Sequence, residues 1–295
     1  MTRVVSLLPA GTEIVAALGA ATALVGISHE CDYPAAVRGL PRVTATPIDP
    51  NWPSGKIDQA VRELGRLSRP VVAVNSEQIR RLAPDLIISQ TLCEVCAVAD
   101  GEVHRLVDIL NPAPRVVSLN AGDLAGIWRD IETVGAELEL QDAARELNLD
   151  LQDRLRRLAA QGGKLPARRR VLTIEWLDPP FTAGHWIPEL IQIAGGRDAA
   201  AQPGQHSRRI GWEEAARLKP DLVLVMLCGF DLERSLKELE AMADSTANDF
   251  LGSLPVWVLD GNAYTSRAGP RVVDGANLMH LALENNESDG IVRYR

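Results

Sequence analysis

A short segment of the chain occurs twice, and this repeat constrains the fold more than any other feature of the sequence. Residues 82–88 read Leu-Ala-Pro-Asp-Leu-Ile-Ile, and residues 218–224 read Leu-Lys-Pro-Asp-Leu-Val-Leu. Each copy is typical of the last turn of a helix, a Pro-Asp break and a short apolar strand buried on both faces. A cysteine follows each copy, Cys93 in the first case and Cys228 in the second. The repeat predicts two similar lobes with a cleft between them.

Short apolar runs alternate with segments of helical periodicity along the chain. This alternation is typical of parallel sheets that helices cover on both faces. The runs of the first half lie at residues 4–8, 24–27, 71–74, 86–89 and 116–119. Those of the second half lie at residues 171–174, 222–225 and 256–259. The predicted fold class is α/β, with a parallel sheet in each lobe and the second sheet smaller than the first.

Two consecutive helices are predicted in the middle of the chain, over residues 123–136 and 141–161. At about 1.5 Å per residue the second helix is roughly 30 Å long. Gly162 and Gly163 follow it, as expected where a helix ends in a left-handed cap. We therefore expect an N-terminal lobe at residues 1–140, a rigid connecting helix at 141–162 and a C-terminal lobe at 163–295.

Composition narrows the class of protein. The chain has 295 residues, of which 46% are hydrophobic and 24% charged, and its net charge is -8. This charge argues against nucleic acid as a partner, because phosphates attract clustered Lys and Arg. No apolar stretch is long enough to span a bilayer. Glu13 interrupts the apolar start, which argues against a secretory signal. We expect a soluble cytoplasmic monomer, or a periplasmic protein if a leader has been removed.

Chemically distinctive side chains follow the predicted strands, where ligands bind to open parallel sheets. The candidate ligand-binding residues are Thr12, His29, Cys31, Tyr33, Cys93, Trp176, Phe181, His185, Trp186, Cys228 and Tyr264. Thr12 is expected to cap the first helix and to expose backbone N–H groups to a polar ligand.

The cysteines leave several alternatives open. His29, Cys31, Cys93 and Cys96 could together hold a soft metal ion. Cys93 and Cys96 could instead form a redox dithiol, or the thiols could line the pocket without bonding to anything. A closed structural zinc site is not expected, because no second Cys pair has the required spacing. The signature loops of serine hydrolases, zinc proteases and P-loop proteins do not occur, so neither hydrolysis nor nucleotide binding through such a loop is expected.

The chain resembles a known family at five motifs. They are residues 7–13 (Leu-Leu-Pro-Ala-Gly-Thr-Glu), residues 26–34, which end in Asp-Tyr-Pro, residues 82–86, residues 179–184 (Pro-Pro-Phe-Thr-Ala-Gly) and residues 266–271 (Ser-Arg-Ala-Gly-Pro-Arg). Their order and spacing resemble the vitamin B12-binding protein of bacterial ABC importers. The resemblance implies the class III binding-protein fold, in which one rigid helix joins two α/β lobes that hold a corrinoid, haem or siderophore. The Cys-bearing segments look like those of a distinct subgroup without a signal peptide.

The resemblance also implies a function. Tyr33 and Phe181 would press on the corrin, and Trp176, Trp186 and Tyr264 would lie in neighbouring loops. We expect a non-catalytic binder of cobalamin or a related corrinoid, acting with an ABC permease or as an intracellular carrier. His29 or a cysteine would offer the cobalt an axial ligand. The alternatives are a thiol-dependent enzyme or metallochaperone that uses Cys93 and Cys96, and a haem or ferric-siderophore binding protein.

Overall fold

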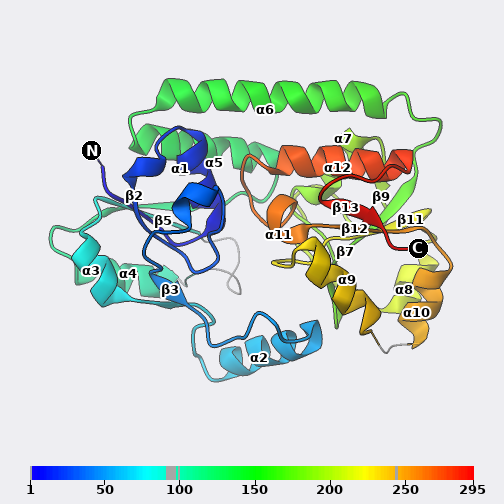
Figure 1. The fold of residues 1–295 in the computed structure, drawn as a ribbon, viewed down its shortest axis with the longest axis horizontal. Helices are drawn as coiled ribbons and strands as arrows, with labels where there is room; N and C mark the ends of the chain where they lie inside the picture. Colours follow the sequence, from blue (N-terminus) through cyan, green and yellow to red (C-terminus); the bar gives the residue numbers. More distant parts are fainter. Residues whose placement is uncertain (1, 91–97, 99, 243–244) are drawn as a thin grey trace. The chain divides into compact units, whose positions relative to one another are not determined.

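The computed structural model describes residues 2–90, 98, 100–242 and 245–295, which form two compact units (Figure 1). The first unit contains residues 1–52, 59–121 and 125–149. The second contains residues 53–58, 122–124 and 150–295. The predicted connecting helix is present as α6 (Gln141–Gly162), and the division between the units falls inside it.

The first unit contains a four-stranded sheet with the strand order β2-β1-β5-β6, and every neighbouring pair is parallel. Its strands are β1 (Val4–Ser6), β2 (Leu24–Ile27), β5 (Leu86–Gln90) and β6 (Arg115–Leu119). The helices of the first half are α1 (Pro9–Ala17), α2 (Ser54–Arg66), α3 (Ser76–Leu82), α4 (Asp100–Asp108) and α5 (Leu124–Glu137), with the 3-10 helices η1 (Ala21–Ala23) and η2 (Ala35–Val37). The parallel sheet predicted for this lobe is confirmed.

One predicted strand does not join that sheet. The apolar run at residues 71–74 contributes only β4 (Ala73–Val74), which pairs antiparallel with β3 (Thr44–Ala45) in a separate two-stranded sheet. The prediction that this run lies in the parallel sheet was wrong. Apolarity alone does not distinguish a strand of the main sheet from a short strand that pairs outside it, because both can contain a run of apolar residues.

The second unit contains a seven-stranded mixed sheet, and it is larger than the first. Its strands are β7 (Arg170–Leu177), β8 (Pro180–Thr182), β9 (Arg197–Asp198), β10 (Arg208–Arg209), β11 (Leu222–Val225), β12 (Val256–Leu259) and β13 (Ile291–Arg293). β7, β11 and β12 are parallel as predicted, whereas β8, β10 and β13 pair antiparallel. The prediction of a smaller sheet was wrong, because these short added strands have no extended apolar run.

The repeated segment has the local structure that its sequence predicts. α3 ends at Leu82, Ala83 takes a left-handed conformation at φ 42°, and β5 begins at Leu86. In the second copy α8 (Trp212–Arg217) ends one residue earlier, Lys219 has φ 48°, and β11 begins at Leu222. Each copy therefore ends a helix with a left-handed turn and then starts a strand whose first four residues are buried.

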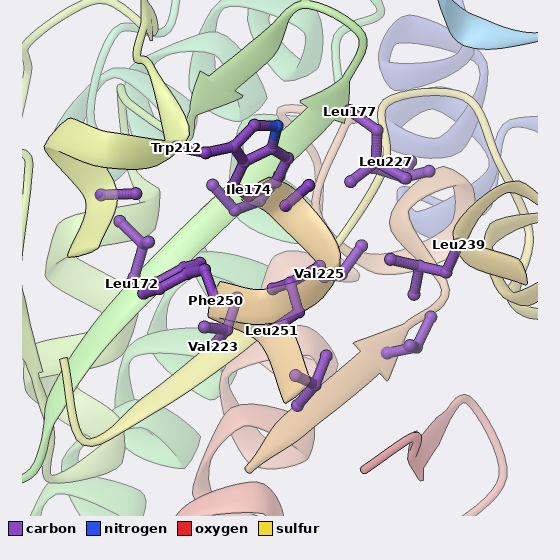
Figure 2. Packing of buried hydrophobic residues seen from close by; sticks show 14 of the residues in the cluster. Leu172, Ile174, Leu177, Trp212, Val223, Val225, Leu227, Leu239, Phe250 and Leu251 are labelled. Carbon is purple, nitrogen blue, oxygen red and sulfur yellow. The ribbon is translucent and has the colours of Figure 1, made fainter. Parts of the chain in front are cut away.

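The hydrophobic core of the second unit contains strands β7 and β11. Candidate ligand-binding residues lie at or just beyond the ends of these two strands. Figure 2 shows side chains from β7 and β11, among them Ile174 and Val225, in one cluster with Trp212 of α8. α10 (Ser245–Gly252) contributes Phe250, whose ring centroid lies 6.2 Å from that of Trp212. The remaining helices of this unit are α7 (Ile187–Ala194), α9 (Leu232–Glu240), α11 (Gly261–Tyr264) and α12 (Val272–Glu284).

The end of α6 differs from the prediction. Neither Gly162 nor Gly163 has a positive φ, so the left-handed cap predicted there was wrong. Gly162 instead allows a close approach: a Cβ at this position would lie 2.8 Å from backbone atoms at the end of α7. Among the helices that the structure describes, none has both the length and the apolarity needed to cross a membrane.

Candidate functional site

In the first unit, the loop after β2 holds His29 in a defined position. The backbone N–H of His29 donates to Thr44 Oγ1 at 2.9 Å, and its ring Nδ1 lies 2.7 Å from the same oxygen. Thr44 Oγ1 in turn donates to Ser28 Oγ at 3.2 Å. With Thr44 donating to Ser28, the tautomer of His29 that satisfies this network carries its proton on Nδ1. The Nε2 atom of His29 then carries the lone pair of the neutral ring.

The surroundings also keep the His29 ring uncharged. Burial lowers the pKa of His29 below its ordinary value, and the Arg42 guanidinium lowers this pKa further. Arg42 is held in place because it donates to the Ser28 carbonyl at 2.9 Å and to the Cys31 carbonyl. A neutral imidazole with a free lone pair is the form that binds a metal centre.

Cys31 belongs to the same loop, and its thiol contacts Thr12 of α1. The Thr12 hydroxyl and the Cys31 thiol are 3.1 Å apart, and both side chains are buried. Thr12 does not cap α1 as predicted, because Leu8 is the N-cap residue and the helix already begins at Pro9. The helix starts earlier because proline favours its first turn. Tyr33, by contrast, is 46% exposed.

In the second unit, three aromatic side chains meet at the end of β7. Trp176 pairs with Phe181 across the β7–β8 ladder. The Trp176 ring also meets Phe230 edge to face, with 5.3 Å between the ring centroids. The Arg234 guanidinium lies 3.6 Å from the centroid of Phe230 on the ring face. Trp176 and Phe181 are half-buried, so part of each ring remains accessible to a ligand. The contact with Phe230 fixes the orientation of the Trp176 ring.

The loops after β11 and β12 are tied to each other. Cys228 is half-buried and its N–H donates to the Glu175 carbonyl at 2.9 Å. The N–H of Gly229 donates to Ser266 Oγ at 3.3 Å, and that of Asn262 donates to the Phe230 carbonyl at 3.0 Å. These bonds hold the loop around Cys228 and Phe230 against α11 and the residues that follow it.

Tyr264 and Trp186 differ in accessibility. Tyr264 is half-buried at the end of α11, with the Arg271 guanidinium 5.7 Å from its ring centroid. Trp186 is only 6% exposed, and its indole N–H donates to the Thr265 carbonyl at 3.1 Å. Trp186 therefore lies in the core of the second unit, where apolar burial explains its presence.

The preceding residue, His185, lies beside His206. The Nε2 atom of His185 is 3.2 Å from His206 Nδ1, and the ring planes are perpendicular. Burial lowers the pKa of His185 below its ordinary value, and the neighbouring His206 ring lowers it further.

Two predicted residues cannot be placed. Cys93 and Cys96 lie outside the described residues. Both the redox alternative and the soft-metal alternative require this thiol pair. Within the described ranges, no three side chains of His, Cys, Asp or Glu are arranged to hold a metal ion. The metal set built on His29 and Cys31 stays a prediction.

Sequence reasoning missed Thr44, Arg42 and Phe230. Thr44 and Arg42 follow the His29 loop by more than ten positions in the sequence, and nothing local marks them as its partners. Phe230 could have been found, because it directly follows Cys228-Gly229 at the end of a predicted strand.

Comparison with known proteins identifies the family. The model of the periplasmic binding protein family matches residues 4–259, which is most of the chain. The chain belongs to this family. Members of the family are substrate-binding transport proteins that work with ABC permeases, and they are not enzymes. The alternative of a thiol-dependent enzyme therefore has no support. A search of curated proteins found no match.

Solved structures with the same fold bind more than one kind of ligand. The periplasmic heme-binding protein RhuT from Roseiflexus sp. RS-1 matches with a TM-score of 0.70 and 21% identity over 96% of this chain and 98% of its own. A periplasmic heme-binding protein from Pseudomonas aeruginosa matches with a TM-score of 0.68 and 20% identity over 99% and 97%. The periplasmic vitamin B12-binding protein BtuF of Vibrio cholerae matches with a TM-score of 0.64 and 21% identity over 96% and 97%. At these identities the similarity establishes the two-lobed α/β fold of class III binding proteins.

Proposed function

We propose that this chain binds a corrinoid of the cobalamin type as the substrate-binding component of an ABC importer. The observation that carries this proposal is the state of His29. Its ring is neutral and its Nδ1 is held by Thr44, so Nε2 can serve as an axial ligand to cobalt. A similar fold in the vitamin B12-binding protein of Vibrio cholerae supports the ligand class.

The aromatic side chains supply a second argument. Tyr33 in the first unit is 46% exposed. Trp176 and Phe181 in the second unit present half-buried rings. Ring faces of this kind pack well against a large, flat and mostly apolar macrocycle. We propose that these three aromatic residues contact the corrin ring. Cys228 and Tyr264 lie in neighbouring loops of the second unit and complete the proposed set of contacts.

Haem is the second candidate, because an imidazole nitrogen also ligates haem iron and two of the similar structures are heme-binding proteins. A ferric siderophore fits His29 less well, since the chelator's own donors already surround its iron. The proposal therefore favours a macrocycle with an exchangeable axial position.

The test uses two corrinoids that differ at that position. Aquocobalamin has a water that His29 can replace, whereas both axial positions of cyanocobalamin are filled. We expect the full chain to bind both in calorimetry, and to shift the visible absorption spectrum of aquocobalamin only. In His29→Ala the spectral shift should disappear while cyanocobalamin still binds.

The same titration includes haemin and a ferric hydroxamate. Absence of heat and of a spectral change with both corrinoids would overturn the proposal. A Soret shift with haemin alone would assign the chain to haem, and heat with the hydroxamate alone would assign it to siderophores.

A further inference from the structure

The pair formed by His185 and His206 is independent of the proposed corrinoid contacts. His185 lies between β8 and α7, and His206 lies two residues before the start of the short strand β10. β8 and β10 pair antiparallel, with Thr182 opposite Arg208. The two histidines lie just beyond this end of the ladder, in the loops that extend from the two strands. Their nearest ring nitrogens, Nε2 of His185 and Nδ1 of His206, are 3.2 Å apart.

The backbone holds the two loops together at this point. The His185 N–H donates to the Gln205 carbonyl at 2.6 Å, and the His185 carbonyl accepts from the Gly204 N–H at 3.0 Å. A Cβ at Gly184 would lie 2.5 Å from the Gln205 carbonyl oxygen, so only glycine permits this approach. His185 itself has a φ of 55°, in the left-handed region. The chain therefore brings the rings together through a close and specific loop contact.

The distance between the two nitrogens matches a chelate. Metal ions of the zinc and copper type lie about 2.0–2.1 Å from imidazole nitrogens. An ion at that distance from both nitrogens, held 3.2 Å apart, would subtend an N–metal–N angle of about 100–106°. This angle is close to tetrahedral. The His185 ring is shielded by its burial from protonation, and exposed His206 can turn its ring toward the ion.

We propose that His185 and His206 form a binding site for a divalent transition-metal ion such as Cu²⁺, Ni²⁺ or Zn²⁺. Imidazole is a favoured ligand of these ions. No third His, Cys, Asp or Glu joins the pair within the described part of the chain, so water completes the coordination. The site is open and can exchange its ion.

The test measures metal binding by the full chain after treatment with a chelator and desalting. We expect one Cu²⁺ to bind with nitrogen hyperfine structure from two imidazoles in electron paramagnetic resonance. Calorimetry with Zn²⁺ and Ni²⁺ should give the same stoichiometry. His206→Asn and His185→Asn keep a hydrogen-bonding group at each position but remove the ring nitrogen. Each should weaken Cu²⁺ binding by about tenfold or more.

Gln202→Ala is the matched control, because this exposed residue lies in the same loop and its side chain is an amide rather than an imidazole. It should leave Cu²⁺ affinity unchanged, and thermal melting shows whether each variant is folded. Absence of Cu²⁺ binding by the unmodified chain would overturn the proposal. So would wild-type affinity in either folded histidine variant, since the ion would then bind elsewhere.

Discussion

The Asp221 carboxylate accepts a hydrogen bond from the backbone N–H of Arg170 at 2.7 Å, and Asp85 accepts one from Arg3 at 2.8 Å. In both cases the aspartate belongs to the repeated segment, and the arginine immediately precedes or begins the adjacent parallel strand. The arginine side chains complete the contact, because Arg170 donates to the Leu218 carbonyl and Arg3 to the Leu82 carbonyl, each at 2.7 Å. The hydrogen bonds of the repeated segment thus attach the end of a helix to the start of a neighbouring strand.

Removing this attachment should destabilise the chain. Asp221→Ala loses the acceptor for the Arg170 N–H, and we expect the free energy of unfolding to fall by about 1 kcal/mol. Asp221→Asn retains a side-chain oxygen and should lose less. Chemical denaturation of both variants measures the difference, and equal stability of the alanine and wild-type chains would contradict the role assigned to Asp221.

The Thr44 hydroxyl should control ligation by His29. In Thr44→Val the ring loses its hydrogen-bond partner, and we expect aquocobalamin affinity to fall by about 10- to 100-fold. Cyanocobalamin affinity should change much less. Thr133→Val is the control, because the Thr133 hydroxyl donates to the carbonyl of Arg129 within its own helix, α5. An unchanged aquocobalamin spectrum in Thr44→Val would show that Thr44 does not position the ring.

Ligation by His29 should also persist in mild acid. Because burial lowers the pKa of His29 below its ordinary value of 6.5, the ring keeps its Nε2 lone pair as the pH falls through 6.5. The spectral shift of aquocobalamin should therefore titrate away with a midpoint below pH 6.5. A pH series of absorption spectra tests this, and a midpoint above that value would contradict it.

Asp130 makes stability depend on pH in a defined window. Burial raises the pKa of Asp130 from 3.8 to about 6, although N–H groups of Asn120 and Ala121 oppose the rise. Between pH 3.8 and pH 6 the Asp130 carboxyl is protonated in the folded state and ionised in the unfolded state. The bound proton stabilises the folded state, and this stabilisation disappears as the pH rises from 3.8 through 6. The stability of the wild type relative to Asp130→Asn should fall by about 2 kcal/mol across this window. A flat difference between the two denaturation curves would contradict it.

Gly162 and Gly163 should respond oppositely to alanine. A Cβ at Gly162 would lie 2.8 Å from backbone atoms of residues 193–195, whereas at Gly163 the nearest atom is 3.4 Å away. Gly162→Ala should cost about 1–3 kcal/mol of stability through overpacking. Gly163→Ala should be neutral or slightly stabilising, because it restricts the unfolded chain. Comparing the two melting temperatures tests the close approach of α6 to the end of α7.

Local sequence was sufficient for the repeated helix–turn–strand segments and for several strand bounds. Residues 24–27, 222–225 and 256–259 are strands over the predicted ranges. Such runs are recognisable because a strand buried on both faces needs continuous apolar side chains. The connecting helix was predictable for a similar reason, since its apolar positions recur with the helical period.

The candidate site was only partly predictable, and Trp186 shows why. An aromatic residue beyond a strand can face a ligand or fill the core, and the sequence is the same in both cases. Its indole bonds to the Thr265 carbonyl, which is 79 positions away in the chain. No pattern in the sequence near Trp186 predicts this contact with Thr265.

Strand ends, helix ends and the α/β class followed from local patterns, because they depend on neighbours within a few residues. Pairing between distant segments decided the rest. It added the antiparallel strands β8, β10 and β13, placed Thr44 beside His29, and brought His185 to His206. These contacts arise only when the folded backbone brings remote residues within bonding distance, and short-range propensity carries no information about them.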